Sequence, residues 1–179
     1  MTQQAKGDWP QLVQVFLDAS PLRMAHWNPQ TGEIFAPPRG PKARVALEKF
    51  ELRLLEEDDW LEVPFLESDA AFDLVVRWVE SLDPGKGKRA LMEALQREKP
   101  FRHVRAVLGQ MPGMQRRYQR VLREEAEARL VELCVSMELT LDHPRFVELA
   151  PHFVDPPEEI APNVRRIASL SLGKNRACD

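Results

Sequence analysis

Cysteine is scarce in this chain of 179 residues, which contains only Cys134 and Cys178. Two cysteines so far apart do not build a disulfide framework, and no C-x-x-C pair is present for a zinc site. Cys134 falls on the apolar side of a predicted helix, where a small core residue is a simpler interpretation than a catalytic thiol. We therefore expect a fold that depends on its hydrophobic core and a reducing, cytoplasmic location.

Long apolar runs are absent as well. No stretch approaches the 18 residues that a membrane-spanning helix needs, and the N-terminus has no basic stretch followed by an apolar core. The sequence therefore predicts neither a membrane span nor a secretory signal, and we expect no membrane partner.

Motifs of metal, nucleotide and nucleophile chemistry are also missing. The histidines are His26, His103, His143 and His152, and none is spaced as a metal ligand with a neighbour. No G-x-S-x-G motif occurs, and the run DPGKGKRA lacks the spacing of a Walker loop. We therefore predict no catalytic residue, no metal and no cofactor. An enzyme whose site is assembled from separate residues, such as His26, Glu33 and His103, stays an alternative.

The chain does contain the pattern of a small antiparallel sheet. Residues 22–37 predict a β-hairpin, because a type I turn begins at Asn28 and Gly32 supplies a left-handed residue. Residues 60–65 predict a third strand. Pro64 cannot donate a backbone hydrogen bond, so this strand is placed at an edge or an end of the sheet.

Helical spacing of apolar residues dominates the rest of the chain. Helices are predicted after Asp8, over 42–57, from a Ser68 cap to about residue 82, over 88–96, over 101–108 and over about 115–137. Together these patterns indicate an α+β fold, in which a small antiparallel sheet packs against a predominantly helical C-terminal half. We predict a single α+β domain over 1–137 and a Pro-rich C-terminal extension over 138–179, with a mobile tail in its last ten residues.

Several short motifs follow one another in a recognisable order. They are TGEIF, WLEVP, FDLVVRWVESL, the block PFRHVR and the long helix that begins at YQRVLREE. In this combination the chain resembles an uncharacterised bacterial protein family catalogued under the number zero-one-five-eight. The matching positions are Thr31, Gly32, Glu33, Trp60, Leu61, Pro64, Phe101 and Arg102, within a region of about 24–137.

The match to that family has departures. Pro100 replaces the usual Ala of its G-A-F-R-R-F-K block, and His103 and Val104 replace the Arg and Phe. The family has no assigned reaction, cofactor or partner. The resemblance therefore implies a fold and leaves the function to be argued from the residues.

Basic residues concentrate in one stretch of an otherwise acidic chain. Eight Lys or Arg and one acid lie between Arg97 and Arg123, whereas the net charge of the whole chain is −3. Helical spacing puts five arginines on the outer sides of two helices: Arg102, Arg105, Arg116, Arg120 and Arg123. If these helices are antiparallel neighbours, the five arginines border one candidate interaction face.

Three interpretations of this basic face stay open. In the first, the face is solvated or is paired internally with the acidic segment 48–67. In the second it binds a partner protein, and in the third it binds nucleic acid. A protein partner of unknown identity is favoured over nucleic acid, because the chain is acidic, has a single Tyr and carries no nucleic-acid-binding signature. We therefore expect a non-catalytic, cytoplasmic interaction module that uses this face.

Overall fold

A three-stranded antiparallel sheet with the order β3-β2-β4 lies in the N-terminal half of the chain. It consists of β2 (Ala25–Trp27), β3 (Ile34–Phe35) and β4 (Leu61–Val63). The structure is a computed structural model that describes residues 2–40, 43–57 and 59–154. The predicted hairpin and third strand are confirmed, and β4 is an edge strand that ends directly before Pro64.

The turn of the hairpin follows from two residues. The Asn28 side-chain oxygen accepts hydrogen bonds from the backbone N–H groups of Gln30 and Thr31, at 2.9 and 3.0 Å. Gly32 has a φ of +83°, which a residue with a side chain rarely adopts. The predicted left-handed glycine is therefore confirmed.

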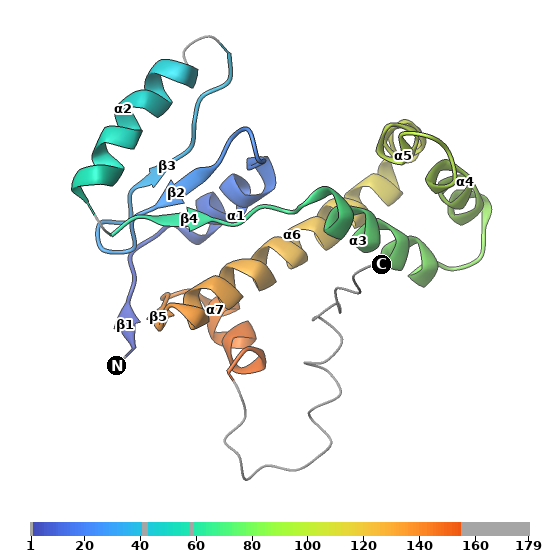
Figure 1. The fold of residues 1–179 in the computed structure, drawn as a ribbon. Helices are drawn as coiled ribbons and strands as arrows, with labels where there is room; N and C mark the ends of the chain where they lie inside the picture. Colours follow the sequence, from blue (N-terminus) through green and yellow to red (C-terminus); the bar gives the residue numbers. More distant parts are fainter. Residues whose placement is uncertain (1, 41–42, 58, 155–179) are drawn as a thin grey trace, which may run out of the picture.

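The two faces of the sheet are covered by different helices. On one face the fully buried Trp27 packs into a first core with α1 (Trp9–Asp18) and the C-terminal half of α6 (Pro112–Ser136). On the other face α2 (Ala43–Glu56) places Phe50 against His26, with 5.1 Å between their ring centroids. This sandwich, completed by the C-terminal elements given below, forms the first lobe (Figure 1).

A second lobe holds the middle of the chain. It consists of α3 (Ser68–Ser81), α4 (Lys86–Leu95), α5 (Pro100–Gly109) and the N-terminal half of α6 (Figure 1). Its core is separate from the first and contains the buried residues Val75, Trp78, Val79, Leu91, Ala94, Val104 and Leu108. The fold is thus α+β with a helical C-terminal half, as predicted, but its apolar residues divide between two cores.

Helix α6 joins the two lobes because its buried side changes along its length. Near its start, Met114 and Tyr118 pack against the second core, whereas Leu130 and Cys134 lie in the first. Twelve residues separate Tyr118 from Leu130, which places them about 120° apart around a helix of 3.6 residues per turn. The two lobes therefore pack on different sides of one helix.

The chain after α6 belongs to the first core over its described part. β5 (Leu139–Thr140) pairs in parallel with β1 (Gln3–Gln4), and it is followed by α7 (Pro144–Leu149) and a 3-10 turn over Ala150–His152. Leu139, Leu141 and Phe146 are buried among the first-core residues. The part of the predicted extension up to residue 154 is thus packed on the domain, while residues 155–179, with the predicted mobile tail, lie outside the described residues.

The start of α3 differs from the prediction, and its buried side is broad. Ser68 is the first helical residue rather than the cap; Glu67 precedes it, and no side chain caps the helix. Phe72 and Val76 are only partly buried, while Leu74 and Trp78 join Val75 and Val79 in the interior. The helix buries a wide side because it contacts α4 and, through the Trp78–Tyr118 ring pair, also α6.

Candidate interaction surface

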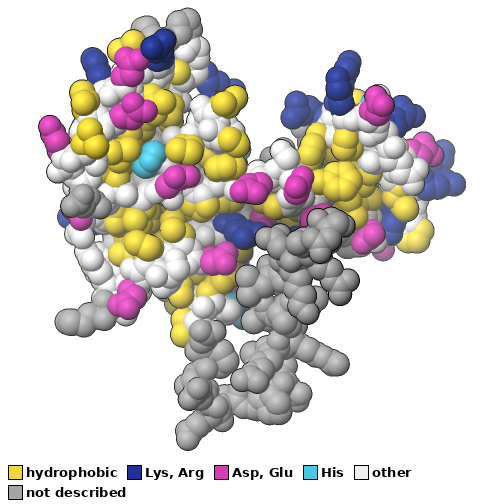
Figure 2. Space-filling view, viewed as in Figure 1, with side chains coloured by type: hydrophobic (Ala, Val, Ile, Leu, Met, Phe, Trp, Pro, Cys, Tyr) yellow, Lys and Arg dark blue, Asp and Glu magenta, His cyan; other side chains and the backbone are white. Residues whose placement is uncertain are grey.

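All five candidate arginines are exposed to solvent. Arg102 and Arg105 lie on α5, and Arg116, Arg120 and Arg123 lie on α6. None of the five has a hydrogen-bonded or ion-paired side chain among the described residues. Figure 2 shows Lys and Arg side chains gathered around the upper and outer rim of the second lobe. Their positive charge is therefore available to a partner.

Arginines elsewhere in the described chain behave differently. Each of the six outside residues 77–123 bonds to a carboxylate or a backbone carbonyl: Arg23, Arg39, Arg44, Arg53, Arg129 and Arg145. Arg145, for example, joins α7 to the buried Glu127 of α6 at 2.9 Å. The contrast marks the arginines between residues 77 and 123 as a group without internal partners, and the five candidates on α5 and α6 belong to it.

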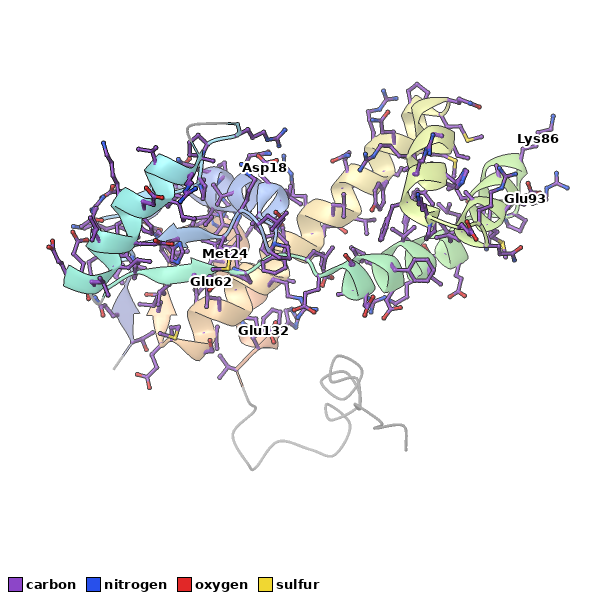
Figure 3. All side chains as sticks on the ribbon, turned by 45° about the horizontal axis from the view of Figure 1, so that its top comes forward. Asp18, Met24, Glu62, Lys86, Glu93 and Glu132 are labelled. Carbon is purple, nitrogen blue, oxygen red and sulfur yellow. The ribbon has the colours of Figure 1, made fainter. Side chains whose placement is uncertain are left out.

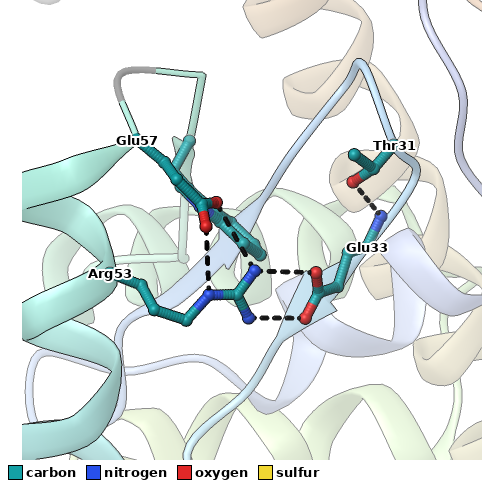
Figure 4. Close-up of polar contacts among 5 residues, drawn as sticks. Thr31, Glu33, Arg53 and Glu57 are labelled. Atoms are coloured by element: carbon teal, nitrogen blue, oxygen red, sulfur yellow. Dashed lines mark hydrogen bonds and ion pairs between the residues drawn. The ribbon is translucent and has the colours of Figure 1, made fainter.

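The acidic segment 48–67 does not neutralise this group in the part of it that the structure describes. Arg53 of α2 holds Glu33 through two hydrogen bonds of 2.8 and 3.0 Å and also contacts Glu57 (Figure 4). Glu48 pairs with Arg44 of the same helix. Helix α2 lies at the far end of the molecule from α5 (Figure 1). Internal pairing between this segment and the candidate arginines is therefore excluded for the residues described.

The five arginines do not share one face. Figure 1 shows α5 end-on while α6 lies in the plane of the view, so α5 crosses α6 instead of running antiparallel to it. Tyr118 packs against Trp78 of α3 and lies close to Arg105. Burial raises the pKa of the Tyr118 phenol, and the nearby Arg105 charge partly opposes that rise. Arg120, two residues further along α6, lies on the opposite side of the helix.

On that opposite side, α1 and α6 form a groove of about 440 Å³. Its lining consists of Gln14, Leu17, Asp18, Gln119, Arg120, Leu122 and Arg123. Figure 3 shows Asp18 at the end of α1 that faces the second lobe. We call this hollow the α1–α6 groove. Arg120 and Arg123 thus belong to a shaped site, whereas Arg102 and Arg105 lie on α5.

The residues of the alternative enzyme site are not brought together. His26 is covered by Phe50, Glu33 is bound to Arg53, and His103 lies on α5 in the second lobe. Neither the α1–α6 groove nor the hollow lined by Ser20, Phe65 and Ser68 contains His26 or His103 in its described lining. Burial raises the pKa of the Cys134 thiol to about 12, so this thiol is not an activated nucleophile.

Burial also lowers the pKa of His26 below its ordinary value of 6.5, and the nearby Glu62 carboxylate only partly opposes this effect. The unfolded chain therefore takes up the His26 proton at a higher pH than the folded chain. We expect a contribution to stability that is complete above pH 6.5 and is lost as the pH falls toward the lower, folded-state pKa.

Urea unfolding measured from pH 7.5 down to pH 5 checks this expectation. The loss of stability specific to His26 should disappear in His26→Gln, which cannot titrate. An identical pH dependence in the variant and the parent protein would show that His26 is not responsible.

No group of three His, Cys, Asp or Glu side chains within residues 2–40, 43–57 and 59–154 is arranged to hold a metal ion. None of the helices in that part of the chain combines the length and apolar composition that crossing a membrane requires.

Comparisons of the chain with protein-family models, with curated proteins and with solved structures found no match. Membership of the numbered bacterial family therefore stays a prediction. The positions that match this family fall in two places. In the first lobe, Arg53 pairs with Glu33 and lies over the Trp60 ring; in the second lobe, Phe101 and Arg102 lie on α5.

The α1 wall of the groove could not be predicted from the sequence. Gln14 and Asp18 are polar residues on the exposed side of a short helix, as in any amphipathic helix. They line the same groove as Gln119 only because α1 packs against α6, which follows it about a hundred residues later in the sequence. No local signal in the sequence reports such a contact.

Proposed function

We propose that the protein is a non-catalytic, cytoplasmic interaction module whose basic residues on α5 and α6 bind an acidic region of a partner protein. The observation that carries this proposal is the set of exposed arginines on α5 and α6 without an internal partner, in a chain whose described arginines outside residues 77–123 are all bonded. Guanidinium groups recognise carboxylates through paired hydrogen bonds, so an acidic protein surface is a suitable ligand.

A protein partner is favoured over nucleic acid for two physical reasons. Single-stranded nucleic acids bind by stacking bases on exposed aromatic rings, and no exposed large hydrophobic side chain in the described part is aromatic. A long polyanion would also meet acidic side chains that follow one another across the connection between the lobes (Figure 2). Glu62 on β4, Glu67 directly before α3 and Asp69 in the first turn of α3 are exposed along this path. A short acidic protein segment avoids them.

The proposal is tested by reversing three charges on α6. We expect the triple variant Arg116→Glu, Arg120→Glu, Arg123→Glu to fold normally, because exposed substitutions usually change stability by less than about 0.5 kcal/mol each. In pull-downs at about 50 mM salt, where ionic contacts are strong, it should lose the partners that the parent protein retains. The matched control is Lys6→Glu, Arg44→Glu, Lys49→Glu, the same charge change on exposed residues of the first lobe, and it should keep them.

Three outcomes contradict the proposal. Identical partners on the parent protein and the triple variant would show that the α6 arginines do not bind them. Tight, strongly salt-dependent binding of a labelled RNA or DNA oligonucleotide, lost in the triple variant alone, would assign these arginines to nucleic acid instead. An unfolded triple variant would show that the arginines support the fold.

A further inference from the structure

The α1–α6 groove combines positive charge, apolar surface and the free side-chain amide of Gln119 in one hollow. We infer that it is a binding site for a short acidic peptide segment that carries an apolar side chain. This inference rests on the proposed function and makes it more specific, since it assigns the acidic partner to one side of α6 and to one type of contact.

The charge of the groove comes from two arginines. Arg120 and Arg123 are three residues apart, so their side chains emerge from neighbouring positions on the same side of α6. Among the described lining residues the one carboxylate is Asp18, which already accepts a hydrogen bond from Gln14 at 3.1 Å and pairs with Arg39 at 3.5 Å. The two guanidinium groups are therefore not neutralised by the lining, and a carboxylate entering the groove would find free donors.

The rest of the lining suits a peptide better than a free anion. Leu17 and Leu122 are half-buried and offer apolar surface to a side chain. The Gln119 amide makes no hydrogen bond with the described residues, so it is free to bond a peptide backbone. A volume of about 440 Å³ lies within the usual range of roughly 300–1,000 Å³ for sites that bind small ligands. A few residues of a peptide therefore fit.

The geometry also separates this site from the other arginines. Arg102 and Arg105 lie on α5, which packs on the Tyr118 side of α6, away from the groove. They provide a matched set with the same charge and similar exposure. If attraction were only a matter of overall charge, reversing either pair would weaken binding equally.

The test uses a fluorescein-labelled peptide GDLEELDG and fluorescence anisotropy at about 50 mM salt. We expect the double variant Arg120→Glu, Arg123→Glu to weaken binding by at least about tenfold, whereas Arg102→Glu, Arg105→Glu should weaken it by less than about threefold. The peptide GDSEESDG, which keeps the charge and loses both leucines, should bind more weakly than GDLEELDG. In NMR spectra the side-chain amide signals of Gln14 and Gln119 should shift as the leucine peptide is added.

Equal weakening by the two double variants, or no binding of GDLEELDG to the parent protein, overturns the inference. The proposed function is judged separately by the pull-down. A partner lost with the triple α6 variant but retained by Arg120→Glu, Arg123→Glu would leave the proposed function standing while the groove assignment falls. If the triple variant also retains every partner, the proposed function and the groove assignment are both rejected.

Discussion

Replacing Leu130 by Ala is expected to lower the free energy of unfolding by about 3–5 kcal/mol. Leu130 is 1% exposed and lies in the middle of the first core, where α6 packs against α1 and the sheet. Removing its branched side chain loses the burial of three carbon atoms and leaves a cavity that rigid neighbours fill only in part. The cost falls at the upper end of the range because Trp9, Phe16 and Trp27 are rings that cannot easily move into the space.

Urea unfolding followed by circular dichroism measures this effect. Leu133→Ala is the matched control, because Leu133 lies on the same helix but is only half-buried, and its loss should be clearly smaller. Comparable losses in the two variants, or a loss below about 1 kcal/mol for Leu130→Ala, would place Leu130 outside the core. The slope of the urea dependence should stay unchanged if both variants unfold from the same native structure.

The local elements of this fold were predictable because their signals are local. The hairpin depends on the side chain of Asn28 and the left-handed Gly32, which lie within five residues of each other. The start of α5 follows from Pro100, which occupies a position in the first turn where no backbone donor is needed. Such features are set by a few adjacent residues and need no knowledge of the tertiary structure.

The division into two cores was missed, although α6 carries a signal for it. Tyr118, Leu122, Ala126, Leu130 and Cys134 follow one another at intervals of four. A helix turns about 100° per residue, so each step of four moves the apolar side about 40° around the axis. Over the whole series the apolar side rotates by about 160°. The intervals of four alone predict a helix over this stretch, whereas the rotation describes a helix that meets one lobe on one side and the other lobe on another.

The same rotation explains why the five arginines separate. If α6 had a single buried side, all its exposed arginines would lie on the opposite side. If α5 also ran antiparallel to α6, Arg102 and Arg105 would then lie next to them. Because the start of α6 packs on the second core, Arg120 and Arg123 turn toward α1. Their exposure could be predicted from helical spacing. The groove could not, because its other wall comes from Gln14, Leu17 and Asp18 on a helix that is distant in sequence.

Replacing Leu91 by Ala is the second change with a large expected effect. Leu91 is fully buried on α4, at the centre of a core of only seven buried residues. We expect a loss of about 2–5 kcal/mol from the stability of the second lobe. The adjacent Met92 is 44% exposed, and Met92→Ala should change stability by less than about 0.5 kcal/mol.

Hydrogen exchange would locate the loss caused by Leu91→Ala. Amides of α3, α4 and α5 should exchange faster, while those of α1 and β2 keep their protection, because the first core contains no residue of the second. Equal acceleration in both lobes would show that α6 couples them into one cooperative unit.

Exchange at the start of α6 matters most for function. Arg120 and Arg123 depend on that half of the helix, which packs on the second core, so opening of the second lobe should also weaken peptide binding in the α1–α6 groove.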